Sequence, residues 1–400
     1  MPRLSSEKET CHGSGAVPAT RQQVESAGHN EEMLHTERNE DNDGNGRALG
    51  WFGCPYTIQE TLLWVRHYIR PQLGAGLHGS VAACRADVPD GDSIRLLFFG
   101  DLMPPPFGRV PSVDPSLREI FASADLTIGN LEAAVGRDST RLNRMQIAPD
   151  TLARALDGLA IRPDRCLLSI ANNHAGDLGG DGIRHTATMV ERLGITPLGW
   201  KERDGSPLSK ILVKGLSIGF FSWTQWLNRP EPPGAASLWC EHDVFAWLAG
   251  NERQRTDFLV AFPHWGFEFE HSPRTTEREL AMRLASHGVQ LIVGHHPHVI
   301  QQLEWLESTA CLYSLGNLVA GRGLSVRWPF RLGALLAIDV VMQPGGRVQV
   351  VGYEIHPIAS CCSRRGNRIV PLAALKPRMR AKFVRRFDRI YPSRTAKGCA

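Results

Sequence analysis

The sequence lacks several features that mark membrane and secreted proteins. No apolar run approaches the roughly eighteen residues that a membrane-spanning helix requires. The first residues contain no apolar core of a secretory signal. The nine cysteines are scattered and include no CxxC pair, which argues against a disulfide framework or zinc ribbon and for a reducing compartment. These absences predict a cytoplasmic protein without a transmembrane segment.

What is present is an ordinary globular composition with unevenly placed charge. The 400 residues, 42% of them hydrophobic, suffice for a sizeable core. The net charge is +4, but residues 361–400 hold twelve Lys and Arg against one acid, Asp388, so they carry +11 and the rest of the chain −7. Such a tail predicts contact with an acidic surface: the body itself, which we favour, an acidic leader peptide or an anionic membrane. No motif indicates nucleic-acid binding.

Composition divides the chain into four segments. Residues 1–50 are polar with almost no aromatics, and we expect them to be disordered. Residues 51–92 contain a short amphipathic element that we expect to dock on the body, followed by a linker. Residues 93–360 form the expected catalytic domain. In the basic tail, 361–400, apolar residues at near-helical spacing between Met379 and Tyr391 predict an amphipathic helix.

Within the catalytic segment, short β-rich runs alternate with helical patterns at 182–193 and 277–286, which predicts an α/β fold. Several runs end directly in a polar cluster, and α/β folds place their sites at the carboxyl ends of strands. The runs cover 94–99, 125–128, 166–170, 258–262, 290–293 and 311–313, and a β-hairpin is expected over 334–341 and 347–354.

The most distinctive cluster is Gly294-His295-His296-Pro297-His298. In an extended segment, His296 and His298 would share a face and converge on one ion. His295 would then point elsewhere, free to act as an acid or a base. The alternative is a polar surface turn, but three histidines directly after a buried strand favour metal ligands.

Carboxylates and amides follow the other strands. Asp101 is a candidate ligand, because the prolines after it argue against its alternative role as a helix N-cap. Glu132 alone would more often be solvated, but among these groups it can bridge two metals. Adjacent Asn172 and Asn173 either form a turn or offer an amide oxygen to a divalent ion.

Histidines complete the candidate site, with His264 as a further ligand and His174 as a general acid or base. Asp177 and Glu268 lie where they can orient imidazoles, or are purely structural. Carboxylate, amide and imidazole groups without thiolates favour one or two ions of Mn, Zn, Fe or Ca. The candidate catalytic residues are His295, His174 and Asp177, and the candidate substrate contacts are Asn172, Glu268, Trp265 and Asn317.

Six ordered motifs, Gly-Asp, Asn-Leu-Glu, Asn-Asn-His, His-Trp-Gly, Gly-His-His-Pro-His and Tyr-Ser-Leu-Gly-Asn, resemble those of the CapA family over residues 94–358. These capsule and poly-γ-glutamate synthesis proteins are related to calcineurin-like metallophosphoesterases. The resemblance implies a four-layer αββα sandwich with a metal centre at the strand ends and His174 as proton donor. The implied metal ligands are Asp101, Glu132, Asn173, His264, His296 and His298.

Departures from the wider phosphoesterase pattern argue against simple phosphatase activity. Met103 stands where that pattern has a histidine, and its bridging aspartate motif is represented by Asn-Leu-Glu. Capsule-type members are typically membrane-anchored, whereas we expect no anchor in this chain.

Three functions are compatible with this site. The CapA-like group is similar to a branch containing a lasso-peptide epimerase, which implies inversion of a peptide α-carbon by two acid/base groups, His295 and His174. The alternatives are a metal-dependent hydrolase of a phosphoester or γ-glutamyl-type amide, and a capsule or poly-γ-glutamate assembly protein. The expected partner is a peptide or poly-amino-acid substrate, and the oligomeric state is not predicted. Nearby tryptophans either shape an apolar pocket or belong to the core: Trp223, Trp226, Trp265, Trp305 and Trp328.

Overall fold

The computed structural model describes residues 57–69, 82–85, 93–105, 108–141, 144–201, 205–229, 237–250, 256–321, 327–343, 346–363 and 366–392. The segment 1–50, for which we expect disorder, lies outside the described residues. All described residues belong to one unit, residues 46–400.

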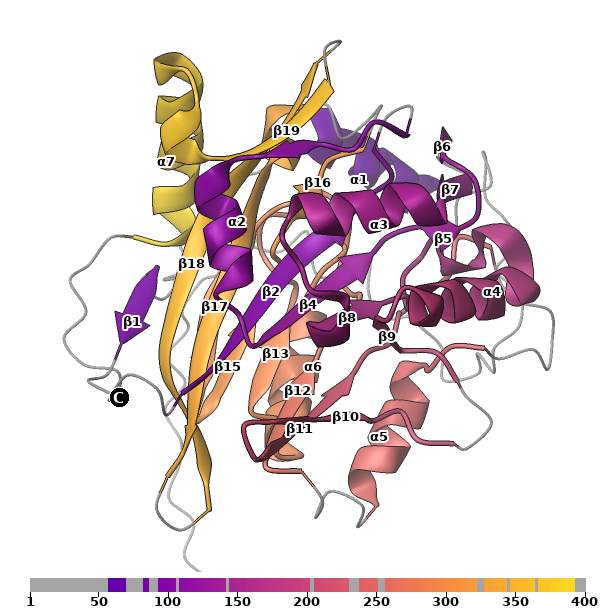
Figure 1. Cartoon of the computed structure of the whole chain (residues 1–400), viewed down its shortest axis with the longest axis vertical. Helices are drawn as coiled ribbons and strands as arrows, with labels where there is room; N and C mark the ends of the chain where they lie inside the picture. Colours follow the sequence, from indigo (N-terminus) through magenta and orange to yellow (C-terminus); the bar gives the residue numbers. More distant parts are fainter. Residues whose placement is uncertain are drawn as a thin grey trace, which may run out of the picture. The chain divides into compact units, whose positions relative to one another are not determined.

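The larger of two main β-sheets has ten strands in the order β3-β19-β18-β17-β2-β4-β8-β9, with β1 beside β18 and β16 beside β2 (Figure 1). Four consecutive strands of this order run parallel to one another: β2 (Ile94–Leu102), β4 (Leu126–Leu131), β8 (Cys166–Ser169) and β9 (Thr196–Leu198). Helices make the crossovers between them, as parallel pairing requires. The remaining strands are β1 (Ala83–Arg85), β3 (Ser112–Val113), β16 (Asn317–Val319), β17 (Leu332–Met342), β18 (Val348–Ser363) and β19 (Gly366–Pro371).

The second sheet has six strands in the order β10-β11-β12-β13-β15-β14. Its four inner strands run parallel: β11 (Leu216–Phe221), β12 (Phe258–Ala261), β13 (Leu291–Val293) and β15 (Thr309–Leu312). Its edges are antiparallel strands β10 (Ser209–Val213) and β14 (Leu303–Leu306). A small third sheet joins β5 (Ala134–Val135), β6 (Ser139–Arg141) and β7 (Arg144–Ile147).

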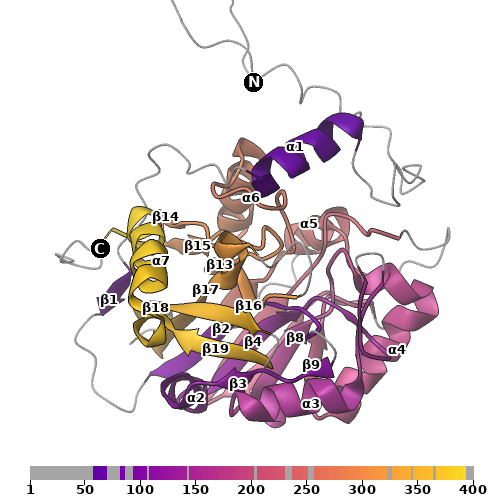
Figure 2. The same ribbon diagram turned by 90° about the horizontal axis from the view of Figure 1, so that it is seen from above.

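The two main sheets pack face to face between layers of helices. Along β2, Leu96 and Phe98 belong to the core between the sheets, whereas Leu97 and Phe99 belong to the core beneath the outer helices, as the two-residue period of a strand requires. Figure 2 shows α2 and α3 on the opposite side of the sheets from α5 and α6. The predicted four-layer αββα sandwich is therefore confirmed. The outer helices are α2 (Pro115–Ala122), α3 (Pro149–Gly158), α4 (Gly179–Arg192), α5 (Glu241–Ala249) and α6 (Thr275–Ser286).

Two further helices lie outside this pattern. Helix α1 (Ile58–Ile69) corresponds to the amphipathic element expected before the catalytic segment. Helix α7 (Pro377–Ile390) is the helix expected in the basic tail, and it docks on the body because Phe383, Phe387 and Ile390 enter the core between the sheets. The boundary drawn at residue 360 falls inside β18, and β19 follows in the same sheet, so the start of the tail is part of the larger sheet.

Two sequence expectations about the environment can be compared with the structure. No helix in the described part of the chain combines the length and the apolarity needed to cross a membrane. Cys84 in β1 is disulfide-bonded, so the cysteine pattern does not support a reducing compartment. The cytoplasmic location therefore stays a prediction.

Candidate metal centre

Polar side chains from both sheets meet where the parallel strands end. Short parallel bridges continue the second sheet beyond its strands, from Thr224 to His264 and from His264 to His295, and bring these loops into register. Each of the side chains is at most 4% exposed. The larger sheet supplies Asp101, Glu132, Asn173 and His174, and the second sheet supplies His264, His295, His296 and His298.

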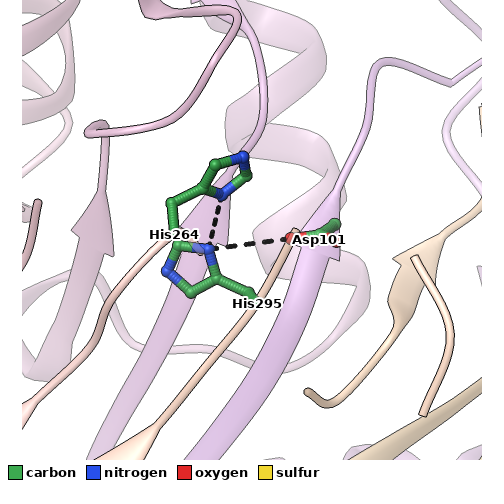
Figure 3. A group of neighbouring side chains, drawn as sticks. All are labelled: Asp101, His264 and His295. Atoms are coloured by element: carbon green, nitrogen blue, oxygen red, sulfur yellow. Dashed lines mark hydrogen bonds and ion pairs between the residues drawn. The ribbon is translucent and has the colours of Figure 1, made fainter. Parts of the chain in front are cut away.

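His295 lies inside this cluster rather than apart from it. Its Nδ1 is 2.7 Å from Nδ1 of His264 and 4.0 Å from Oδ1 of Asp101 (Figure 3). The other nitrogen of the His264 ring, Nε2, lies 3.1 Å from Oδ1 of Asn173. The expectation that His295 points away from the ligands is therefore wrong, and His295 is itself a possible ligand.

The segment 294–298 is not extended, which corrects the reason for which its histidines were expected to converge. His296 has φ 105° and His298 has φ 57°. Non-glycine residues in such conformations cost about 1–3 kcal/mol each, and they concentrate at functional sites. Gly294 is required here, since a Cβ would lie 2.2 Å from both Trp265 Nε1 and the Tyr313 carbonyl oxygen. The two histidine rings still lie 6.0 Å apart, centre to centre.

These groups fit a divalent ion. Three sets of ligand atoms, each within 4.8 Å of one another, occur in the described part of the chain: Asp101–His264–His295, Glu132–His264–His296 and Asp101–Glu132–His298. Both nitrogens of His296, Nε2 of His295 and both oxygens of Glu132 are buried without a hydrogen bond. Buried polar groups normally have partners, and an ion would provide one. The shared members permit one ion or two.

Burial and charge together set the protonation of the cluster. Burial lowers the pKa of His264 and His296 well below the usual range and that of His295 to about 4, so these imidazoles are neutral at pH 7. Burial raises the pKa of Glu132 well above its usual range. Burial alone would lower the pKa of His298, but the carboxylates of Glu132 and Asp101 outweigh it and raise this pKa to about 10. Neutral imidazoles are the form that binds metal ions.

Side-chain hydrogen bonds hold the candidate ligands in place. Asn317 Oδ1 lies 3.0 Å from His298 Nδ1, and its amide nitrogen donates to the carbonyl oxygens of His298 and Phe330. Asn130 Nδ2 donates to Asp101 Oδ1 at 2.8 Å. Asn130 was not predicted as a site residue, although it stands in the Asn-Leu-Glu motif. Such outer partners fix the orientation of metal ligands.

His174 and Asp177 form a buried pair next to the cluster. His174 Nδ1 lies 2.9 Å from Asp177 Oδ2, which also accepts the Met145 backbone N–H at 2.6 Å. This arrangement leaves His174 Nε2 at 3.5 Å from Asn228 Nδ2. A carboxylate on one imidazole nitrogen fixes the tautomer of the ring. The geometry is that of an oriented acid/base group.

The predicted substrate contacts divide into two kinds. Asn172 and Asn317 are fully buried; Asn172 donates to the Leu131 carbonyl and accepts the His174 backbone N–H, so both brace the site. Trp265 is fully buried in the core behind the site and donates to the Tyr313 carbonyl oxygen, which does not support a contact with substrate. Glu268 is half-buried.

Of the five tryptophans considered for an apolar pocket, Trp226 lies against the cluster. Its ring meets that of His296 edge-on at 4.7 Å. Trp223 lies with Trp265 in the core of the second sheet, Trp328 packs on Phe383 of α7, and Trp305 pairs with Tyr353. The core alternative is therefore correct for Trp223 and Trp265.

Sequence and structure comparisons identify similar proteins. The chain is 27% identical over 286 residues to the PGA biosynthesis protein CapA of Bacillus subtilis (strain 168), covering 66% of this chain and 72% of that protein. It is 28% identical over 193 residues to the capsule biosynthesis protein CapA of Bacillus anthracis, covering 44% and 46%.

Solved structures with a similar arrangement include a putative 5'-nucleotidase from Staphylococcus aureus in complex with alpha-ketoglutarate, with TM-score 0.45 and 14% identity over 73% of this chain and 58% of that one. A phosphatase from Mycoplasma pneumoniae has TM-score 0.41 and 15% identity, over 72% of this chain and 96% of that one.

The sequence also matches a protein-family model, that of the bacterial capsule synthesis protein PGA_cap. The match covers residues 96–322, which are more than half of the chain and include all the strand-end motifs. The chain therefore belongs to this family of CapA-like proteins.

Proposed function

We propose that this protein is a metal-dependent enzyme that removes and returns the proton on a peptide α-carbon, and that its reaction is epimerisation of the C-terminal residue of a ribosomal peptide. The observation that supports this proposal is the pair of buried imidazoles, His295 and His174, at the ligand cluster. Each has a carboxylate beside it, Asp101 for His295 and Asp177 for His174. Inversion at carbon requires two such groups.

The chemistry requires one base and one acid. His295 is neutral at pH 7 and has Nε2 without a hydrogen bond, as a base must. It would take the α-proton while the electron pair of the C–H bond moves onto the neighbouring carboxyl group. His174, oriented by Asp177, would return a proton to the opposite face. A divalent ion held by the two ligand sets that leave His295 free, Glu132–His264–His296 and Asp101–Glu132–His298, would supply positive charge that stabilises the negative charge on that carboxyl group.

A metal-dependent hydrolase is the second candidate. Two of the three ligand sets share Glu132, which is compatible with two ions, and two-ion centres are typical of hydrolases. The names of the relatives, PGA and capsule biosynthesis proteins, suggest a poly-amino-acid or its γ-glutamyl amide as the alternative substrate. Met103, buried in the apolar core beneath the outer helices, stands where the phosphoesterase pattern has a histidine, which argues against a generic phosphatase.

The test is incubation in deuterium oxide with peptides that end in tryptophan, with a divalent ion or a chelator, read by mass spectrometry. We expect gain of one deuteron without cleavage, and its loss in His295→Asn with the ion still bound. His185→Asn, a change on the exposed face of α4, is the matched control. Metal-dependent release of phosphate or an amine, without exchange, would reject epimerisation and establish the hydrolase.

A further inference from the structure

Through Trp64, helix α1 contacts the loop that follows β12 and carries the candidate ligand His264. The indole Nε1–H donates to Oε2 of Glu268, a residue 204 positions later in the chain and four positions after His264. Glu268 is half-buried, whereas the ligand side chains are at most 4% exposed. This carboxylate is therefore more exposed than the candidate ligands, and within the described residues α1 supplies it with a hydrogen-bond donor.

An aromatic stack fixes the Trp64 ring. Its centroid lies 5.2 Å from that of Phe269 and 6.0 Å from that of Tyr68, which itself stacks on Phe330 at 5.4 Å. Phe269 in turn lies 6.0 Å from the ring of His298. Rings at these separations attract one another beyond simple burial. The indole N–H is thus held by packing that continues to a candidate ligand.

The C-terminal half of α1 is attached at two further points. The Arg327 side chain donates to the carbonyl oxygen of Ile69 at 2.9 Å, and His67 Nδ1 lies 3.6 Å from Oε1 of Glu270. Because Glu270 lies two residues beyond Glu268, the His67 contact ties the helix a second time to the segment that carries Glu268. Trp64 therefore has a defined position relative to the cluster.

Glu268 acts electrostatically on the ligands. The backbone N–H of the next residue, Phe269, donates to the Pro297 carbonyl oxygen at 2.9 Å, which holds this segment against the loop of His296 and His298. A carboxylate close to metal ligands adds negative charge near a bound cation and so raises the affinity of the site for that cation. The position of Glu268 therefore affects how tightly an ion is held.

We propose that Trp64 is a positioning residue, whose indole N–H holds the Glu268 carboxylate towards the ligand cluster and so strengthens the binding of a divalent cation. This inference rests on the metal centre of the proposed function but not on the reaction. Helix α1 lies outside the family match at residues 96–322. The inference gives this helix a role in metal binding.

The experiment is a double-mutant cycle on the metal-free full chain, read by calorimetric titration with Mn²⁺ alone. Trp64→Phe keeps an aromatic ring and removes the N–H, and Glu268→Gln removes the charge. Loss of an outer partner typically weakens metal binding about 10- to 100-fold, and we expect each variant to fall in this range. The double variant should bind no more weakly than Glu268→Gln, because Trp64 acts through that charge. Tyr68→Phe, which preserves the stack, should bind as the wild type does.

The outcomes separate this inference from the proposed function. Unchanged affinity in Trp64→Phe, or losses that multiply in the double variant, would overturn the positioning role, because a merely structural effect does not depend on the Glu268 charge. Wild-type protein that binds no Mn²⁺ would overturn the metal centre and this inference together. Mn²⁺ binding that follows the expected cycle, in a protein that exchanges no α-proton, would support the inference and reject the epimerase.

Discussion

Arg386 allows a quantitative prediction that is independent of the reaction. The residue lies on the inner face of α7 with Phe383 and Phe387 and is 5% exposed. Its Nε and Nη2 are buried without an acceptor among the described residues. Burial, followed by the charge of Arg389, lowers its pKa from the usual arginine value to about 10. Within the described part of the chain, no acceptor compensates the charge at these two nitrogens.

The size of the effect follows from this pKa. At about 1.4 kcal/mol for each unit of pKa, the charged side chain destabilises the folded state by about 3 kcal/mol. Because the folded-state pKa lies below the unfolded one, this cost is present in full below pH 10 and declines only as the pH rises from there towards the unfolded-state pKa. Methionine keeps the apolar stem and removes the charge. We expect Arg386→Met to raise the free energy of unfolding by about 1–3 kcal/mol, equally at pH 6 and pH 9.

The assay is urea unfolding of the full chain, followed by tryptophan fluorescence. The free energy of unfolding should fall with urea concentration at the same slope in the wild type and in the variant. The matched control is Arg385→Met, since Arg385 is the preceding residue of the same helix and is exposed. The control should change stability by less than about 0.5 kcal/mol. Destabilisation by Arg386→Met would refute the reasoning, since it would mean that the guanidinium has a partner that stabilises the fold.

Three further predictions concern the site. Asp177→Asn keeps an acceptor for the Met145 backbone N–H but removes the charge beside His174. Because a hydrogen bond to a charged group contributes about 1.5–3 kcal/mol, deuterium exchange should slow by about 10- to 150-fold. The exposed control Asp181→Asn should leave the exchange rate unchanged, and equal rates in the two variants would contradict the acid/base pair. Asn317→Ala removes two hydrogen bonds to His298 and one to the Phe330 carbonyl oxygen, and it should weaken Mn²⁺ binding by about 10- to 100-fold in calorimetry. Wild-type affinity in this variant would show that the Asn317 side chain is not needed to orient His298. Mn²⁺ at a hundred times its Kd should stabilise the metal-free protein by about 2.7 kcal/mol in thermal unfolding, and stabilisation that persists in Glu132→Gln would place the ion elsewhere.

The sequence alone determined which residues follow the strands. Apolar runs of strand length, each ending in a polar motif, predicted β2, β4, β8, β12 and β13 and the side chains at their ends. It also predicted α7, because the spacing of Phe383, Phe387 and Ile390 is a local property of a helix. Since carboxyl ends of parallel strands share one edge of a sheet, the chain order of the motifs was enough to predict that they converge.

The tertiary structure decided how those residues meet. His295 lies between His264 and Asp101 because the loops after β12 and β13 pair beside β2, an arrangement set by the packing of two sheets. The backbone of His296 and His298 departs from an extended strand under the same constraints.

Long-range contacts have no local signature either. Trp64 meets Glu268 across 204 positions, and Trp265, although it adjoins a ligand in sequence, points into the core. The physical reason is that periodicity reports only the direction of a side chain from its own strand or helix. Which side chain it meets depends on sheet order, helix docking and loop conformation, and these are fixed by packing over the whole chain.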